Sequence, residues 1–174
     1  RITTLGGIRT NATYYEDVRV PAANLIGGEN NGWSLITGQL NHERVSLMNV
    51  GPLGRILDEA RRWAQETKRA DGGRVIDEPW VQSNLARVHA KLEVLRLMNW
   101  KQAWALQHGQ LHPADASAVK VFGSEFYVEA YRALLEIFGE QGLLRADSPG
   151  AVLKGRVEMM YRNTLILTFG GGTN

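Results

Sequence analysis

Glu43 is the side chain of this sequence best suited to acid–base chemistry. It lies in the segment QLNHERV (residues 39–45), within a longer run of apolar residues at helical spacing. A carboxylate held in a dry pocket beside a weakly acidic C–H group can act as a general base. A glutamate followed by an arginine on a helix also fits a solvated surface position, and spacing alone leaves both interpretations open.

Metal and thiol chemistry find little support. The sequence has no cysteine, which excludes disulfides, a thiolate nucleophile and a cysteine-bound metal, and which favours a cytoplasmic protein. Its four histidines form no zinc-binding pair with an acid; they are His42, His89, His108 and His112. The segment HERVS, which begins at His42, fails the zinc-protease pattern because it ends in Ser46. We therefore expect no metal site.

Two glycine-rich segments are candidates for anion binding. They are FGEQG (residues 138–142), after a predicted helix, and GGGT (residues 170–173) near the C-terminus. Backbone N–H groups without neighbouring side chains can cradle a phosphate at the start of a helix. Each segment alone is a weak signal, because such glycines more often form an ordinary turn that ends a helix.

The composition is that of a globular domain. Of 174 residues, 44% are hydrophobic and 22% charged, which excludes a disordered polymer and a collagen-like repeat. Lys and Arg number 20 against 18 Asp and Glu, so the net charge of +2 gives no reason to expect nucleic-acid binding. The longest apolar stretches, such as residues 164–169, fall far below the ~18 residues of a membrane span.

Helical periodicity begins at Trp33 and continues almost to the end of the chain. It predicts a mainly α protein, an antiparallel up-down four-helix bundle with helices near residues 33–68, 80–107, 119–137 and 149–167. Pro52 should kink or divide the first helix, and Gly139 should end the third. On the second helix, a stripe of Leu97, Trp100 and Trp104 beside the main apolar seam predicts that a second face is buried.

Residues 1–28 are predicted to form strands and turns. Thr13, Tyr14 and Tyr15 favour strands, and Val18 and Val20 alternate with charged residues. One or two strands are not stable alone, so we expect them to complete a sheet that lies mostly outside this sequence. The first residue is Arg1 and not Met, and the last residue directly follows a triple glycine and Thr173, so we expect both ends to be cut.

Four segments, in this order, resemble the C-terminal portion of acyl-CoA dehydrogenases, the flavoproteins that desaturate acyl thioesters. YEDVRVP (residues 15–21) resembles the exit from the family's middle β-domain. LNHERV (40–45), between GW (32–33) and GPLG (51–54), resembles its first long C-terminal helix. EIFGEQG (136–142) is similar to its flavin-contacting turn, and GGTN (171–174) to the start of its closing motif. The resemblance implies that residues 1–28 end the β-domain and that residues 29–174 form the helical domain without its final helix.

The resemblance also implies FAD-dependent α,β-desaturation of an acyl-CoA, with Glu43 removing the α-proton and the hydride passing to flavin. The family places its carboxylate either before an Arg of the long helix or before the Gly-Thr of the closing motif. Here Glu43 fills the first position and Gly171 stands at the second. Arg44, Gly170 and Gly171 are the implied substrate contacts, and the two glycines would leave room for a branched or polycyclic acyl group.

The cofactor contacts implied by the resemblance are Glu136, Phe138, Gly139, Glu140 and Thr173, together with Arg69 reaching the flavin of a neighbouring subunit. Glu136 and Glu140 replace the family's usual Gln and Gly. Such altered flavin contacts keep open a non-catalytic structural subunit of a heteromeric dehydrogenase, and an acyl-CoA oxidase is a further alternative.

The resemblance implies a homodimer or homotetramer or, alternatively, a heteromer. It also implies a role in fatty-acid or lipid catabolism, with an electron-transfer flavoprotein as the electron acceptor. Because most of the β-domain would be missing, we expect residues 1–174 by themselves neither to retain FAD tightly nor to turn over substrate.

Overall fold

The computed structural model describes residues 2–3 and 9–174, apart from the side chains of Asn41, Arg44 and Val45. Its helices are α1 (Gly32–Leu47), α2 (Gly51–Glu66), α3 (Pro79–Gln107), α4 (Pro113–Phe138) and α5 (Arg156–Thr164). Short 3₁₀ turns are η1 (Ala22–Asn24), η2 (Val75–Asp77), η3 (Gly139–Leu143), η4 (Val152–Gly155) and η5 (Leu165–Thr168). Strand β1 (Ile2–Thr3) pairs antiparallel with β2 (Arg9–Thr10). The predicted mainly α class is confirmed.

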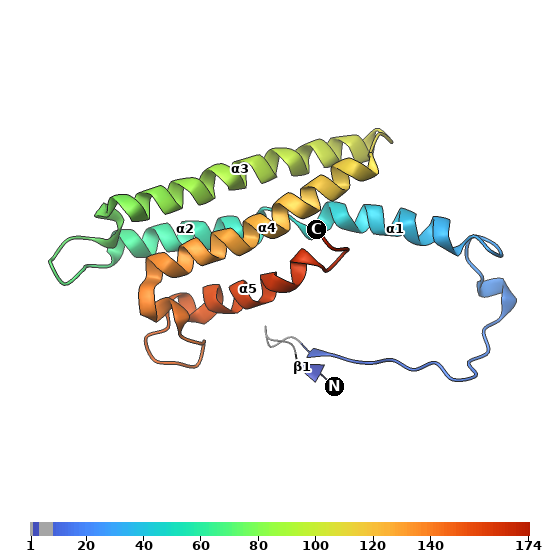
Figure 1. Cartoon of the computed structure of the whole chain (residues 1–174), viewed down its shortest axis with the longest axis horizontal. Coiled ribbons are helices and arrows are strands. Elements are labelled where there is room, and N and C mark those ends of the chain that lie inside the picture. Colours follow the sequence, from blue (N-terminus) through green and yellow to red (C-terminus); the bar gives the residue numbers. More distant parts are fainter. Residues whose placement is uncertain (1, 4–8) are drawn as a thin grey trace.

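Helix α4 is the central element of the fold. It packs against each of the other four α-helices, and Figure 1 shows it lying between α3 and α5. Successive helices from α2 to α5 alternate in direction, which confirms the up-down bundle, while α1 extends beyond the end of the bundle (Figure 1). The C-terminus returns to the point where α1 and α2 meet (Figure 1).

The long first helix is divided rather than kinked. Residues 48–50 separate α1 from α2, and Pro52 lies in the first turn of α2. A proline costs nothing there because the N–H it lacks would have no helical partner. The apolar residues of α2 then point into the core; they are Leu53, Ile56, Leu57, Ala60 and Ala64.

The predicted fourth helix is too long at its start. The chain before α5 is bent by Gly150 and Gly155, with φ of +81° and +65°, and by Leu153 and Lys154, with φ of +46° and +56°. Positive φ values are incompatible with a right-handed helix. A Cβ on Gly155 would come within 2.5 Å of the backbone nitrogen of Ala146, so the turn also needs a residue without a side chain.

The strand predicted near residues 13–20 does not form. All of residues 9–31 are exposed, and beyond Arg9–Thr10 this segment contains no strand. A strand is stable only beside another strand, and the described part of the chain supplies none for these residues. Val18 and Val20 are 61% and 66% exposed, so their alternation with charged residues buries nothing here.

The predicted seam of α3 is buried, but its second stripe is not. Val81, Leu85, Val88, Leu92 and Leu95 all lie in the core. Leu97, Trp100 and Trp104 are 61%, 64% and 54% exposed, so the prediction that this chain buries them is wrong. The other helices pack on the seam side and leave this face open. No helix in the described part of the chain is both long and apolar enough to cross a membrane.

Gly123 of α4 and Gly54 of α2 differ in the room around them. A Cβ on Gly123 would lie 2.5 Å from Met48 Cβ and 2.7 Å from its Cγ, far inside normal contact. A Cβ on Gly54 would lie 3.6 Å from Leu92 Cδ2, an ordinary van der Waals distance. The two glycines therefore form a matched pair inside helices.

We expect Gly123→Ala to destabilise the protein and Gly54→Ala to stabilise it. Alanine is favoured over glycine within a helix by about 1 kcal/mol, and Gly54→Ala should gain up to that amount. At Gly123 the clash with fully buried Met48 should outweigh this gain and cost about 1–3 kcal/mol. Thermal and urea unfolding of the whole protein measure both. Equal stability of the two variants would contradict the close packing of Met48 on α4.

Candidate active site

Glu43 lies on α1, one helical turn before Leu47 at the end of that helix. Its side chain is exposed, while its carbonyl oxygen accepts a hydrogen bond of 2.9 Å from the Ser46 hydroxyl. The side chain of its neighbour Arg44 lies outside the described residues. The described chain therefore holds Glu43 on a helix, but it does not by itself surround the carboxylate with apolar groups.

The closing glycine segment comes against the same end of α1. Gly171 and Gly172 have φ of +75° and +111°, a backbone conformation that favours glycine. A Cβ on Gly171 would come 2.8 Å from Leu47 Cδ1. Gly171 thus packs on α1 one turn from Glu43, and the absence of a side chain allows this close approach.

Side chains from α3 and α4 fix the break where α1 leaves the bundle. Asn99 Nδ2 donates to the Met48 carbonyl oxygen at 2.9 Å, and the Tyr127 hydroxyl donates to the Asn49 carbonyl oxygen. Burial raises the pKa of Tyr127 to about 12, so its hydroxyl remains a donor at neutral pH. These contacts set the direction of α1 and therefore the position of Glu43.

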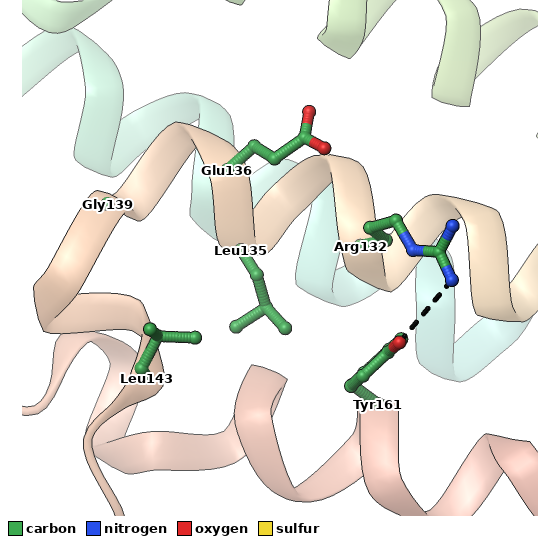
Figure 2. Close-up of a pocket in the computed structure, with 6 residues that line it drawn as sticks. All are labelled: Arg132, Leu135, Glu136, Gly139, Leu143 and Tyr161. Carbon is green, nitrogen blue, oxygen red and sulfur yellow. Dashed lines mark hydrogen bonds between the residues drawn. The ribbon is translucent and has the colours of Figure 1, made fainter.

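A pocket of about 390 Å³ opens at the turn that ends α4 (Figure 2). Gly139, with φ of +61°, ends the helix as predicted. The pocket is lined by Arg132, Leu135, Glu136, Gly139, Leu143 and Tyr161. Arg132 Nη2 points toward the Tyr161 hydroxyl at 3.5 Å, beside the apolar side chains of Leu135 and Leu143 (Figure 2). The Glu136 carboxylate points away from them and accepts a hydrogen bond of 3.4 Å from Asn84 Nδ2 of α3.

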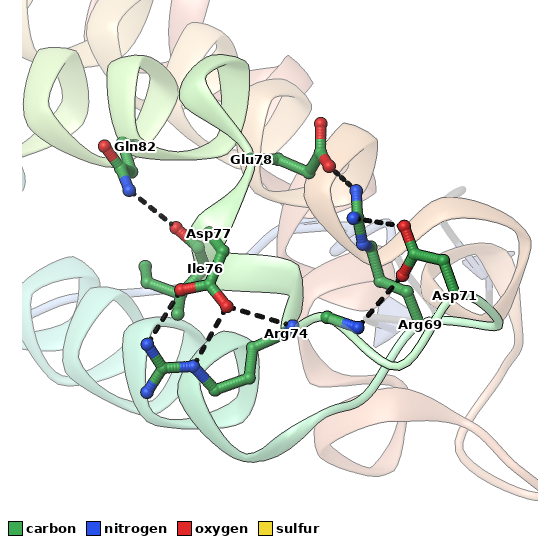
Figure 3. A network of polar contacts seen from close by, with 8 residues as sticks. Arg69, Asp71, Arg74, Ile76, Asp77, Glu78 and Gln82 are labelled. Atoms are coloured by element: carbon green, nitrogen blue, oxygen red, sulfur yellow. Dashed lines mark hydrogen bonds and ion pairs between the residues drawn. The ribbon is translucent and has the colours of Figure 1, made fainter.

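Arg69 is engaged within its own connecting segment between α2 and α3 (Figure 3). Its guanidinium pairs with Asp71 Oδ2 at 2.5 Å and with the Glu78 carboxylate, while its buried Nε has no hydrogen-bond partner among the described residues. Beside it, Arg74 pairs with Asp77 at 2.7 Å, and this hydrogen bond holds the pKa of Asp77 below its usual range. The segment is thus a folded polar cluster.

Comparison with known proteins identifies the family of this chain. Residues 30–174 match the family model described as "Acyl-CoA dehydrogenase, C-terminal domain". The chain belongs to the acyl-CoA dehydrogenase family. It is 59% identical to the acyl-CoA dehydrogenase FadE26 of Mycobacterium tuberculosis, over 99% of this chain and 44% of that protein.

Two solved structures agree with this acyl-CoA dehydrogenase assignment. A chain of the ChsE4-ChsE5 complex from Mycobacterium tuberculosis is 60% identical with a TM-score of 0.89, over 98% of this chain and 43% of that one. The Tcur3481-Tcur3483 steroid ACAD is 44% identical with a TM-score of 0.88, over 99% of this chain and 44% of that one. The chain thus spans less than half the length of these relatives.

The structure brings together only some of the acyl-CoA dehydrogenase site residues predicted from the sequence. Glu43 and Gly171 converge on one end of α1, and Glu136 and Gly139 line one pocket. Phe138 is 4% exposed and its ring packs edge-on against Trp63, with ring centroids 4.9 Å apart, so its side chain belongs to the core. Glu140 and Thr173 are exposed and Gly170 is half-buried.

Arg132 and Tyr161 are pocket residues that sequence reasoning missed. Arg132 lies four residues before Glu136 on α4, so helical spacing places both on one face and gives a usable signal. Tyr161 comes from α5, and nothing in its local sequence indicates the pocket. Its presence there follows only from the packing of α5 against α4.

We expect Tyr127→Phe to destabilise the protein and Tyr131→Phe to leave it unchanged or slightly more stable. Tyr127→Phe removes the hydrogen bond to Asn49 and should cost about 1 kcal/mol. Tyr131 is fully buried four residues later, and its hydroxyl has no hydrogen-bond partner among the described residues. Chemical unfolding measures both free energies; similar losses in the two variants would show that the phenol ring environment, and not the Asn49 contact, matters.

Proposed function

We propose that the whole protein is an FAD-dependent acyl-CoA dehydrogenase in which Glu43 removes the α-proton of an acyl-CoA thioester. The observation that carries this proposal is the packing of Gly171 on Leu47, one turn from Glu43. Membership of the family supports the reaction class. The two segments in which the resemblance puts a catalytic carboxylate are thus in contact, and only α1 bears one at the implied position.

In the proposed reaction, α1 and the C-terminal residues around Gly171 have separate tasks. A thioester α-C–H is a weak acid, so proton transfer to Glu43 needs the negative charge on the thioester oxygen to be stabilised. We assign that task to the backbone around Gly171, because Gly171 packs on Leu47, one turn from Glu43. When bound, FAD would supply the acceptor for the hydride that leaves the β-carbon.

The turn after α4 fits contact with part of that cofactor. Arg132 supplies a cation, Leu135 and Leu143 supply apolar surface, and Gly139 leaves its backbone uncovered by a side chain. The carboxylates of Glu136 and Glu140 would repel a phosphate and would accept hydrogen bonds from sugar hydroxyls. We therefore assign a ring or sugar portion of FAD to this turn. Thr173 is assigned to another part of the same cofactor, and Arg69 to the flavin of a neighbouring subunit.

A polycyclic acyl group is the proposed substrate class. The support is the 44% identity to a protein described as a steroid ACAD. Glycine at residue 171 adds little by itself, because Leu47 occupies the space that a side chain there would fill. The ratio of activities with a steroid-side-chain thioester and with butyryl-CoA tests the preference, and higher activity with butyryl-CoA would overturn it.

Assembly with further subunits, the same or different, is also proposed. The exposed stripe of Leu97, Trp100 and Trp104 on α3 is the kind of apolar face that subunit contacts cover. A similar chain occurs in a structure described as the ChsE4-ChsE5 complex. An electron-transfer flavoprotein is the proposed acceptor.

We expect Glu43→Gln to abolish flavin bleaching by acyl-CoA. Glutamine keeps the shape of the side chain but cannot take up the proton, and loss of a general base costs about 10²–10⁴-fold in rate. Anaerobic stopped-flow absorbance of the whole protein measures the bleaching. Glu66→Gln, a change at an exposed glutamate at the end of α2, should leave the rate unaltered.

The same preparations separate the alternatives. Undiminished bleaching in Glu43→Gln would exclude Glu43 as the base. Purification of the whole protein without flavin would favour a non-catalytic structural subunit. Stoichiometric peroxide formation in air would indicate an acyl-CoA oxidase.

A further inference from the structure

Lys120 of α4 is a buried cation that faces the C-terminal residues of the chain. The residue is 3% exposed, and lysines are rarely buried unless their charge is satisfied. Its Nζ donates to the Thr168 carbonyl oxygen at 3.2 Å, to the Gly172 carbonyl oxygen and to Asn174 Oδ1 at 2.6 Å. These acceptors all belong to residues 168–174, which we call the closing loop.

Ser124, one turn further along α4, holds the same loop. It is fully buried, and its hydroxyl accepts a hydrogen bond of 3.0 Å from Asn174 Nδ2. The Asn174 amide also reaches Glu125 Oε1 at 3.4 Å. Backbone bonds within the loop are local, from Gly172 N–H to Phe169 and from Asn174 N–H to Thr168, both at 3.1 Å. They shape the loop, whereas Lys120 and Ser124 attach it to α4.

The same stretch of α4 also holds the end of α1. Gly123 admits Met48, and the Tyr127 hydroxyl donates to the Asn49 carbonyl oxygen. Residues 120, 123, 124 and 127 follow helical spacing and share one side of α4. The closing loop and the helix of Glu43 are therefore both located by one rigid surface.

We propose that Lys120 is a positioning residue, which holds the closing loop so that Gly171 lies beside the helix of Glu43. Lys120 acts through the loop and is not assigned any contact with substrate. Charge-assisted hydrogen bonds are stronger than neutral ones, and the Lys120 ammonium makes several of them to a loop that contains successive glycines. The catalytic consequence rests on the proposed function, while the attachment of the loop does not.

Amide hydrogen exchange of the whole protein, followed by mass spectrometry, tests the attachment without catalysis. In Lys120→Met, exchange within residues 168–174 should rise about 10- to 100-fold, because bonds to a charged group are lost. Exchange in α3 should stay as in the wild type. Ser124→Ala should raise loop exchange about 3- to 10-fold and serves in place of Lys120→Met should that variant fail to fold.

Lys101→Met is the matched control. Lys101 of α3 is an exposed lysine that pairs with Asp115 of α4 at 3.2 Å, so the same substitution removes an ion pair to the same helix but not to the loop. We expect unchanged loop exchange in this variant.

Flavin-reduction kinetics test the positioning role. At saturating acyl-CoA the rate in Lys120→Met should fall about 100-fold, the cost of a small displacement of reacting groups, with the KM changed by less than about 3-fold. Loop exchange that is unchanged in both Lys120→Met and Ser124→Ala would overturn the proposal. So would faster exchange without a slower rate, or faster exchange spread equally over α4 and α5. A wild-type protein that holds flavin but is not bleached would contradict the proposed function, and the exchange data would then test the loop contact alone.

Discussion

The need to satisfy a buried ammonium group constrains much of this structure. Lys120 lies on the central helix and is only 3% exposed, and an ammonium in the core is costly unless oxygen atoms surround it. Carbonyl oxygens of Thr168 and Gly172 meet that need, although they lie about fifty residues later in the chain. The segment after α5 returns across α4, and its contacts with Lys120 hold the C-terminal residues there.

That return brings two otherwise unrelated segments together. The loop lies against the end of α1, where Leu47 fills the space left by Gly171. The end of α1 is in turn fixed by buried Met48 against Gly123. Glycines at both contacts let backbone and side chain approach closely. Polar side chains form the hydrogen bonds that hold the two segments in place. Close packing and directed hydrogen bonds thus place Glu43 and the closing loop in a single arrangement.

The predictions were right for elements that are defined by neighbouring residues. They were wrong where contacts with residues far along the chain decide the structure. The predicted helix 80–107 corresponds to Pro79–Gln107, because apolar periodicity and Pro79 define it locally, and Gly139 ends α4 as expected. The prediction of a strand near residues 13–20 was wrong because a strand is stable only beside another strand. Glu43 and Gly171 could be singled out by motif. Lys120 could not, since a lysine on a helix is usually solvated and only the returning loop buries it.

Because Glu43 is exposed, the described residues meet only part of what the proposed reaction requires. A general base works on a weak carbon acid only where water is excluded, and the described residues leave Glu43 open to solvent. They nevertheless fix its helix from two sides. Geometry is thus built into α1, α4 and the closing loop, whereas the proposed reaction needs water to be excluded by groups other than the described residues. A base positioned in advance but uncovered until substrate binds would lose little orientational freedom when the site closes, which is where the proposed catalytic advantage lies.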